Sequence, residues 1–191
     1  EKQTIQIGDH YLSISKNEPV DLALQPGEKL CEGRFVLQQK VGNGTSAEVW
    51  RAFDINLQED VALKIFYGEW CDRDEFLPQL RREVKKARKL NHENILNVYD
   101  IHVSESGVPL ISMEYVNGKS LEDHRIRRGM AAWSELLPLV DQLCSAVDYA
   151  HSKKIVHRDI KPANILINQD RDIKLADFGV AQTIVTSTFI T

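Results

Sequence analysis

A short polar segment in the C-terminal half of the sequence carries residue types that suit phosphoryl transfer. Residues 157–164 read HRDIKPAN and lie between two apolar stretches. The carboxylate of Asp159 can accept a hydroxyl proton, and the ammonium group of Lys161 can neutralise a phosphate in transfer. The amide oxygen of Asn164 can bind a metal ion. These three side chains are therefore candidates for chemistry at one site.

A second acidic motif follows the polar segment. Residues 177–179 read DFG, so a carboxylate at Asp177 is followed by a glycine that can act as a pivot. Mg²⁺ prefers oxygen ligands and is commonly bound by a carboxylate together with nucleotide phosphates. Asn164 and Asp177 are therefore candidate magnesium ligands. Either motif alone would suit an ordinary loop, but a chance occurrence of both in this order is very improbable.

A glycine-rich stretch in the N-terminal half has the composition of a phosphate-binding turn. Gly42 and Gly44 are followed by Ala47 and Val49, and the stretch lies between two expected strands. Glycines allow the backbone to approach a ligand and to direct N–H groups at phosphate oxygens. Taken alone, the same residues also suit a hairpin turn without a ligand. A dinucleotide-binding fingerprint is disfavoured, because that motif opens a helix and here a strand follows.

Lys64 ends an apolar strand with the sequence VALK. Its side chain either extends along an edge strand toward solvent or is presented to a phosphate. Glu83, on the helix that follows, is placed to hold this lysine by an ion pair. The other charged residues of the helix are interpreted as a solvated face. They are Arg81, Arg82, Lys85, Lys86, Arg88 and Lys89.

Alternating apolar patterns predict the strands that position these residues. We expect strands at 35–37, 47–53, 61–65, 98–103 and 110–113, joined by tight turns. A helix is expected at 75–90, with Asp74 as its N-cap. The first residues, 4–14, alternate around Gly8-Asp9 and predict a β-hairpin, which a linker at 15–29 follows.

Helical patterns begin after Asn117-Gly118. Ser134 is expected to cap a helix that reaches residue 152, and short apolar runs return at 165–167 and 173–175. The apolar stripe of the helix comprises Leu136, Leu139, Val140, Leu143, Val147 and Ala150. The change in composition predicts a small β-rich lobe followed by the start of a helical lobe, with a ligand in the cleft between them.

The motifs GNGTSAEV, VALK, HRDIKPAN and DFG, in this order, resemble the signature set of the eukaryotic-type protein kinases. The resemblance covers residues 34–191 and is similar in style to the bacterial Ser/Thr kinases. It implies an α+β, protein kinase-like fold with a five-stranded antiparallel N-lobe and one helix, followed by an incomplete, mainly helical C-lobe. The implied parts are an N-terminal extension at 1–32, an N-lobe at 33–116 and a partial C-lobe at 117–191.

The resemblance also implies roles in binding ATP and Mg²⁺. Lys64, paired with Glu83, would hold the α- and β-phosphates. Asp159 would accept the substrate proton, and Lys161 would lie near the γ-phosphate, which favours Ser or Thr as acceptor. The residues implied to cover the phosphates are Val41, Gly42, Asn43 and Gly44. Those implied to hold Mg²⁺ are Asn164 and Asp177.

The adenine site is implied in the same way. Met113 resembles the gatekeeper, and residues 114–116 resemble the hinge whose backbone would bond adenine, so that Glu114 and Val116 are implied contacts. Three apolar side chains would enclose the adenine ring. They are Val49, Ala62 and Leu166.

The leading hypothesis is an ATP-dependent protein Ser/Thr kinase that is present as a fragment. The alternatives are a pseudokinase or truncated kinase-like interaction module, and a small-molecule phosphotransferase. Because the sequence stops within the activation segment, we expect this chain to bind ATP poorly or not at all and to have little kinase activity. We also expect an exposed C-lobe face that a partner or a second copy covers. Arg158 suggests regulation by a phosphate in that segment. The candidate acceptors are Thr183, Thr186, Ser187, Thr188 and Thr191.

Composition and net charge exclude several classes of protein. The chain of 191 residues has 24 Lys and Arg against 28 Asp and Glu, for a net charge of −4. Such a mildly acidic, moderately apolar sequence argues against a disordered tail and a nucleic-acid binder. No apolar run is long enough for a membrane span. The three separated cysteines, Cys31, Cys71 and Cys144, are expected to be reduced thiols in a cytoplasmic protein. The first residues suggest a cut-down chain.

Overall fold

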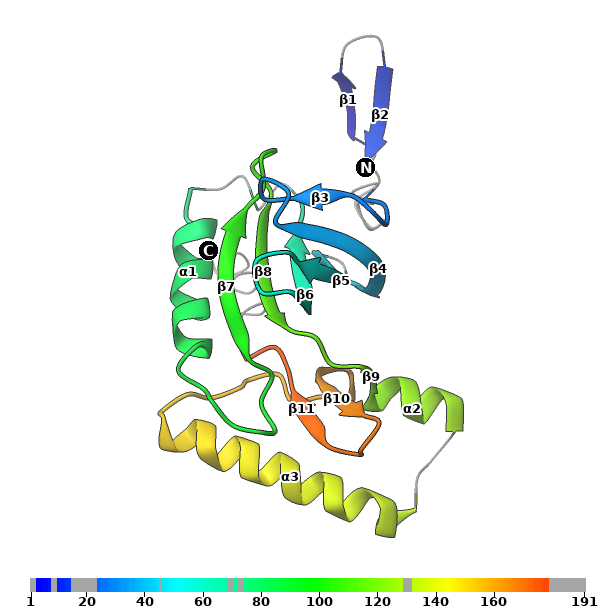
Figure 1. Cartoon of the computed structure of the whole chain (residues 1–191), viewed down its shortest axis with the longest axis vertical. Coiled ribbons are helices and arrows are strands. Elements are labelled where there is room, and N and C mark those ends of the chain that lie inside the picture. The colour runs from blue at the N-terminus through cyan, green and yellow to red at the C-terminus, as the bar shows by residue number, and fades with distance from the viewer. Residues whose placement is uncertain are drawn as a thin grey trace.

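The structure, a computed structural model, describes residues 24–44, 46–68, 71, 74–128 and 132–178, together with the backbone of residues 3–7 and 10–14. An antiparallel sheet in the order β3-β4-β5-β6-β8-β7 forms most of the N-terminal half (Figure 1). Its strands are β3 (Lys29–Leu30), β4 (Phe35–Asn43), β5 (Ala47–Asp54), β6 (Glu59–Phe66), β7 (Val98–Val103) and β8 (Pro109–Glu114). The five expected strands are present, and β3 is a short additional edge strand.

Strand β6 shows how alternation along a strand builds the two faces of this sheet. Ala62 and Phe66 join two clusters on one face, and Lys64 lies between them in the sequence, on the same face. The intervening side chains are fully buried in a third cluster on the opposite face. They are Val61, Leu63 and Ile65. The pattern that buries β6 therefore also fixes the direction in which Lys64 points.

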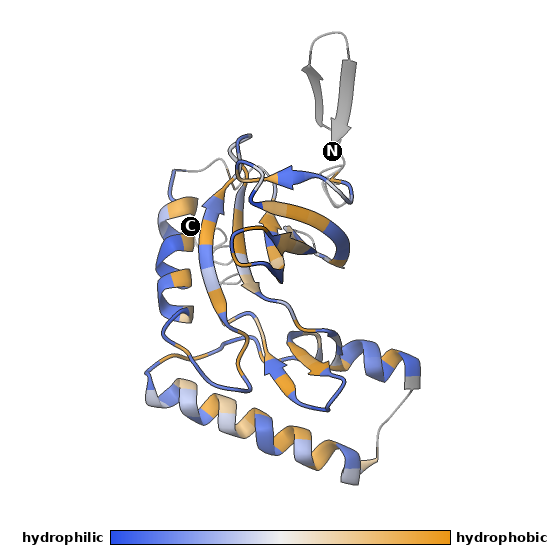
Figure 2. Cartoon of the chain, viewed as in Figure 1, coloured by the Kyte–Doolittle hydropathy of each residue, from blue (hydrophilic) through white to orange (hydrophobic). Residues whose placement is uncertain are grey.

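Helix α1 (Phe76–Ala87) packs on the face of the sheet that carries Phe66. Its ribbon in Figure 2 is mostly hydrophilic, interrupted by the apolar positions that it buries. The helix begins after Glu75, which makes no side-chain cap, so the expected cap at Asp74 is wrong. It also ends earlier than expected, because Leu90 donates its N–H to the carbonyl of Ala87 in a tighter turn.

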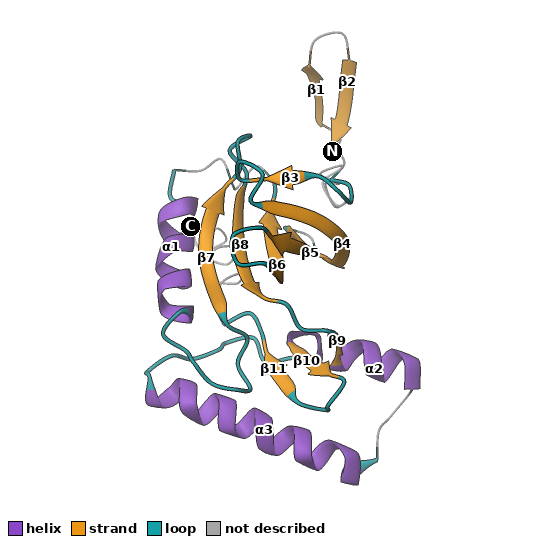
Figure 3. Cartoon of the chain, in the orientation of Figure 1, coloured by secondary structure: helices purple, strands orange, loops and turns teal. Residues whose placement is uncertain are grey.

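The C-terminal half combines helices with a small sheet (Figure 3). Its elements are β9 (Gly118–Ser120), α2 (Leu121–Arg128), α3 (Trp133–Ser152), the 3₁₀ turn η1 (Pro162–Asn164), β10 (Ile165–Asn168) and β11 (Ile173–Leu175). Strand β10 lies between β9 and β11. Residues of α3, β10 and β11 share one core cluster, to which Leu90 and Ile95 from the N-terminal half also belong.

Two helix starts in this half differ from expectation. Helix α3 begins after Ala132, in extended backbone, and Ser134 lies inside its first turn. Helix α2 was not anticipated, although its start carries a recognisable signal: the Ser120 hydroxyl accepts the N–H of Asp123, and the Asp123 carboxylate accepts the N–H and hydroxyl of Ser120. This reciprocal pairing is a capping box with Asp in the place of Glu.

The loop after α1 fastens the two halves to each other. Ile95 forms a parallel bridge with Leu175 of β11. The backbone N–H of Leu96 donates to the Leu175 carbonyl at 3.0 Å, and the Leu175 N–H donates to the Asn94 carbonyl at 2.8 Å. The amide of Asn94 also donates to the side chain of Gln142 on α3. The end of α1 is therefore attached to the C-terminal half by backbone and side-chain hydrogen bonds.

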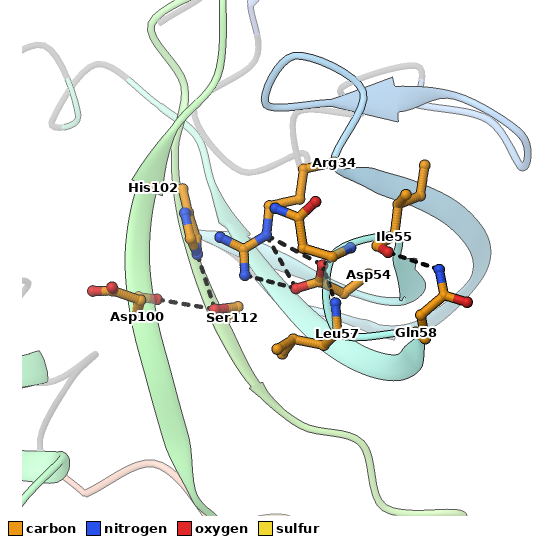
Figure 4. Close-up of polar contacts among 9 residues, drawn as sticks. Arg34, Asp54, Ile55, Leu57, Gln58, Asp100, His102 and Ser112 are labelled. Carbon is orange, nitrogen blue, oxygen red and sulfur yellow. Dashed lines mark hydrogen bonds and ion pairs between the residues drawn. The ribbon is translucent and has the colours of Figure 1, made fainter.

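A polar cluster joins the turn between β5 and β6 to Arg34, the residue before β4 (Figure 4). Arg34 donates to both oxygens of Asp54, whose side chain is 1% exposed, and the backbone N–H groups of Asn56 and Leu57 donate to the same carboxylate. Burial acts to raise the pKa of Asp54, but these hydrogen bonds hold it below its usual value. The buried carboxylate therefore fixes the turn between β5 and β6 to the start of β4.

The N-terminal hairpin expected around Gly8-Asp9 is present as β1 (Gln3–Ile7) paired antiparallel with β2 (His10–Ile14). The two turn residues lie outside the described residues. Within the described part of the chain, no helix is both long and apolar enough to cross a membrane.

Candidate active site

The glycine-rich stretch forms the turn between β4 and β5. The N–H of Gly44 donates to the carbonyl of Ala47 at 2.9 Å, and Thr45 at the tip lies outside the described residues. Gly42 pairs with Val49, and a Cβ at Gly42 would lie 3.3 Å from the Val49 Cβ. The hydroxyl of Tyr67 donates to the Gly44 carbonyl, a contact that no sequence signal predicted.

Lys64 is buried and pairs with the carboxylate of the DFG motif. Its side chain is 10% exposed, and its Nζ lies 2.6 Å from Oδ1 of Asp177. The backbone of Asp177 has a positive φ of 63°. The residue is therefore held in a left-handed conformation that side chains rarely adopt. This pair joins β6 of the sheet to the segment after β11.

The expected ion pair between Lys64 and Glu83 is absent from the described residues. Glu83 is buried on α1, but its Oε1 accepts a hydrogen bond from Lys86 at 2.7 Å. Lys86 is three residues further along the same helix, where side chains are neighbours on the helix surface. The sequence pattern assigns Lys86 to the solvated face of the helix and therefore does not predict its contact with Glu83.

The polar segment 157–164 brings its three candidate residues into direct contact. Lys161 Nζ lies 2.8 Å from Asp159 Oδ2, and the amide of Asn164 donates to the same oxygen at 3.1 Å and to the Asp159 carbonyl at 2.9 Å. The hydrogen bond from Lys161, with a further one from Asn164, holds the pKa of Asp159 below its usual value. Asp159 is therefore an anion at neutral pH, with fixed orientation.

His157 links this segment to the DFG motif. Its Nε2 donates to the Ala176 carbonyl at 2.8 Å, while its Nδ1 accepts the N–H of Asp159. Its ring packs against that of Phe178 with centroids 4.5 Å apart. Burial lowers the pKa of His157, which suits a neutral ring with one donor and one acceptor. The sequence motif alone gives His157 no role. Its position two residues before Asp159 is the signal that could have identified it.

The two candidate magnesium ligands are adjacent through the backbone, because Ala176 donates its N–H to the Asn164 carbonyl at 2.9 Å. The amide nitrogen of Asn164 donates to Asp159, and its Oδ1 accepts no hydrogen bond from the described residues. Asp177 uses only Oδ1 for Lys64. Free amide and carboxylate oxygens suit Mg²⁺. The described residues hold no cluster of three or more His, Cys, Asp or Glu that could hold a metal ion.

The residues implied for adenine binding gather in one apolar cluster between the sheet and β10. Met113 is buried there with Ala62 and Leu96. Half-buried members from both halves pack against them, namely Val49, Tyr115, Val116, Leu166 and Ala176. The N–H of Val116 has no hydrogen-bond partner among the described residues, so it is available to a ligand. Two residues at the end of β4, implied to cover the phosphates, are not members of this cluster: Val41 is 47% exposed, and Asn43 pairs with Glu48 on β5.

The carboxylate of Glu114 fastens the connection between the two halves. Its Oε2 accepts hydrogen bonds from the backbone and side-chain amides of Asn97, both at 3.1 Å. Its Oε1 lies 2.7 Å from Nζ of Lys174 on β11. Only the backbone of Glu114 had been implied in binding, and neither Asn97 nor Lys174 was expected to contribute. These contacts fix the side chain of Glu114, two residues before Val116.

A small cavity of about 20 Å³ lies behind Met113. It is lined by Lys64, Asp177 and Phe178, together with apolar residues at the end of α1 and on β8. Gly179 and the candidate phosphate acceptors from 183 to 191 lie outside the described residues.

Comparisons with known proteins agree with this geometry. The family model for the protein kinase domain matches residues 35–191. Serine/threonine-protein kinase PrkC of Bacillus subtilis is 40% identical over 163 residues, covering 85% of this chain and 25% of that protein. Serine/threonine-protein kinase PknB of Mycobacterium leprae is 37% identical over 161 residues, covering 83% of this chain and 26% of that protein.

Solved structures show the same relationship. The crystal structure of the Mycobacterium tuberculosis PknI kinase domain has a TM-score of 0.71 and 32% identity, covering 83% of this chain and 64% of that one. The chain spans about a quarter of the length of the curated relatives named above. The match over residues 35–191, with the shared fold, shows that the chain belongs to the protein kinase family, among the bacterial serine/threonine kinases of eukaryotic type.

Proposed function

We propose that this chain is the nucleotide-binding part of a protein serine/threonine kinase that transfers the γ-phosphate of ATP to a Ser or Thr hydroxyl. The observation that carries the proposal is the arrangement of Asp159, Lys161 and Asn164, which share hydrogen bonds while the adjacent backbone joins them to Asp177. In the proposed site, Asp159 is the proton acceptor, Lys161 is the cation, and Asn164 and Asp177 supply the two oxygen ligands. Phosphoryl transfer needs these groups and little other chemistry from the protein.

The proposed binding mode follows from the apolar cluster and the connection between the halves. The adenine ring lies between Ala62 and Leu166, against Met113, and accepts a hydrogen bond from the N–H of Val116. The phosphates extend under the glycine-rich turn, where Gly42 leaves room for close approach. Mg²⁺ held by Asn164 and Asp177 supplies charge neutralisation for the phosphates.

In the proposed reaction, Asp159 first accepts a hydrogen bond from the hydroxyl of the protein substrate. As the hydroxyl oxygen bonds to the γ-phosphorus, its proton passes to the Asp159 carboxylate. The bond between the γ-phosphorus and its bridging oxygen breaks, and ADP retains that electron pair. Lys161 neutralises charge on the moving phosphoryl group. The hydrogen bonds from Lys161 and Asn164 orient the Asp159 carboxylate before the substrate arrives.

Lys64 has to exchange partners in this scheme. It now pairs with Asp177, whereas the roles proposed for both residues require Asp177 to face a metal ion and Lys64 to face the phosphates. The buried carboxylate of Glu83 is the remaining partner for Lys64, and it becomes available when Lys86 releases it. The present pairs, Lys64 with Asp177 and Lys86 with Glu83, therefore correspond to an inactive arrangement, and the active arrangement would pair Lys64 with Glu83.

We further propose that this chain transfers phosphate poorly by itself and that its exposed α3 face is covered by other protein. Trp133, Leu137 and Val140 are 68%, 45% and 38% exposed and lie at helical spacing. Such a contiguous apolar patch usually marks an interface. The same proposal places the protein in the cytoplasm, which agrees with the free thiols of Cys31 and Cys144.

The test is a parallel measurement of nucleotide binding and phosphotransfer with this chain and with the full-length protein. We expect the full-length protein to bind ATP with Mg²⁺ more tightly than this chain does, and to label Ser or Thr in a protein substrate. The Asp159→Asn variant should retain binding and lose transfer by about a thousandfold or more. If neither chain binds ATP, the kinase-like interaction module is the better description. Transfer to small metabolites alone would favour the small-molecule phosphotransferase.

A further inference from the structure

The outer face of α1 carries a concentration of positive charge that the proposed reaction does not use. The chain as a whole has a net charge of −4, so this helix opposes the overall balance. At about 100° per residue, the four basic side chains on the helix span an arc of about 140°, and two more follow in the turn after it. All of them are exposed. They are Arg81, Arg82, Lys85, Lys86, Arg88 and Lys89, called the α1 basic face below.

Little negative charge balances the α1 basic face. Arg88 lies 3.5 Å from Asp100 on β7, and Lys86 holds Glu83. The other four basic residues have no acidic partner among the residues that the structure describes. Positive charges three and four positions apart on one helix repel each other. A face of this kind is unfavourable for the isolated helix, and a bound anion would relieve the repulsion.

The chemistry of the face favours phosphate monoesters over single carboxylates. Arg81, Arg82 and Arg88 each present a planar fork of N–H donors that can bind phosphate oxygens in pairs. A phosphorylated side chain carries nearly two negative charges and three acceptor oxygens at neutral pH. Clusters of arginines recognise phosphorylated protein segments in this way.

A membrane surface fits the same face less well. A helix that lies on a lipid surface inserts an apolar side, but α1 has already buried its apolar side against the sheet. None of the exposed large hydrophobic residues in the described chain belongs to α1. Any attraction to lipid would be electrostatic alone.

Lys86 gives the face a connection to the active site. Its side chain is 57% exposed while that of its partner Glu83 is 9% exposed, so Lys86 is reachable from solvent and Glu83 is not. An anion on the α1 basic face competes with Glu83 for Lys86. Release of Glu83 leaves a buried carboxylate without a cation, and the buried Lys64 is the cation on the facing strand.

We propose that the α1 basic face binds a phosphorylated segment of a protein, and that this binding draws Lys86 away from Glu83. The inference goes beyond the proposed function, since binding to this face does not require phosphotransfer by the chain. The coupling to Lys64 rests on the proposed role of that residue in holding nucleotide.

The binding test measures fluorescence anisotropy of a labelled phosphothreonine peptide, without nucleotide. We expect the unchanged chain to bind this peptide and to ignore the same peptide with threonine. The variant Arg81→Gln/Arg82→Gln/Lys85→Gln should bind at least about tenfold more weakly. Glutamine is a good helix former, and circular dichroism checks that the fold is kept. The control Lys29→Gln/Lys119→Gln/Arg127→Gln removes equal charge elsewhere and should stay within about twofold.

Three results would overturn the binding proposal. Equal weakening in both triple variants would mean general charge attraction. Equal binding of phosphorylated and unphosphorylated peptides would exclude recognition of phosphate. Sedimentation with phosphatidylserine vesicles, without peptide binding, would identify a lipid surface instead.

The coupling test adds a fluorescent ATP analogue with Mg²⁺. Saturating phosphopeptide should tighten nucleotide binding by the unchanged chain, and the Lys86→Gln variant should bind nucleotide more tightly from the start, with a smaller response to peptide. Peptide binding without any effect on nucleotide affinity would refute the competition for Lys86. Absence of nucleotide binding in every variant would instead contradict the proposed function while leaving the peptide result intact.

Discussion

Replacement of Lys64 by methionine should separate nucleotide binding from stability. The Lys64 side chain is 10% exposed, but that of its partner Asp177 is 34% exposed, so Asp177 can be hydrated once the lysine is gone. The unpaired carboxylate should therefore cost about 1 kcal/mol or less, well below the value for a fully buried pair. Methionine also fits the apolar residues that line the cavity beside Lys64. We expect almost no change in the free energy of unfolding.

Nucleotide binding should respond much more strongly. A charge-assisted hydrogen bond to phosphate contributes about 2 kcal/mol, which corresponds to about a 30-fold change in the dissociation constant. The assay pairs urea unfolding, followed by tryptophan fluorescence, with titration of a fluorescent ATP analogue in the presence of Mg²⁺. The exposed Lys29→Met variant serves as the control and should change neither quantity.

The two measurements can refute this reasoning separately. A loss of more than about 3 kcal/mol in unfolding free energy would mean that the Lys64–Asp177 pair stabilises the fold as a buried pair does. A nucleotide dissociation constant that changes by less than about threefold would mean that Lys64 does not contact the phosphates.

Three further perturbations test other parts of the structure. Gly118→Ala places a Cβ 2.0 Å from a backbone carbonyl oxygen of β10, so urea unfolding should show a loss of about 2–3 kcal/mol, and an unchanged stability would contradict the close approach of β9. Asp54→Asn should cost about 2 kcal/mol near neutral pH. Because hydrogen bonds hold the Asp54 pKa below its unfolded value, the wild-type advantage is complete above about pH 4 and disappears as the pH falls through the folded pKa; a pH-independent difference would refute the assignment. Tyr67→Phe removes the hydrogen bond to Gly44 and should weaken nucleotide binding by about threefold with little effect on stability, which the same titration measures.

The strands of the large sheet were predictable because they depend on patterns that act locally. Side chains alternate between the two faces of a strand, so the sequence of β6 alone predicts that Ala62 and Lys64 lie on the same face. The motif order then places Met113 and Leu166 in the same cluster, as the resemblance implied. Periodicity therefore sufficed for the five long strands, and motif spacing for the grouping of these apolar residues, but neither predicted α2 or β3.

The charged contacts were less predictable, because one cation has several carboxylates within reach in the folded chain. Lys64 has both Glu83 and Asp177 as neighbours by motif, and only their distances in the structure select Asp177. The contact of Glu114 with Lys174 joins residues far apart in the sequence and has no local pattern. The predicted helix caps were wrong for a different reason. Neither Asp74 nor Ser134 caps its helix, because side-chain capping is only a preference and helix ends vary by one or two residues.

The bridge between Ile95 and Leu175 makes α1 a lever with one fixed end. The C-terminal end of the helix is anchored to the C-terminal half through Asn94 and Leu96, whereas its buried side rests on the sheet. Any rocking of the sheet therefore turns α1 about this anchor. Glu83 lies about one turn from the fixed end and travels a short arc, while Phe76 at the far end travels the longest. Rotation about this anchor therefore changes the distance from Glu83 to Lys64, whereas Lys86 moves together with Glu83 because both lie on α1.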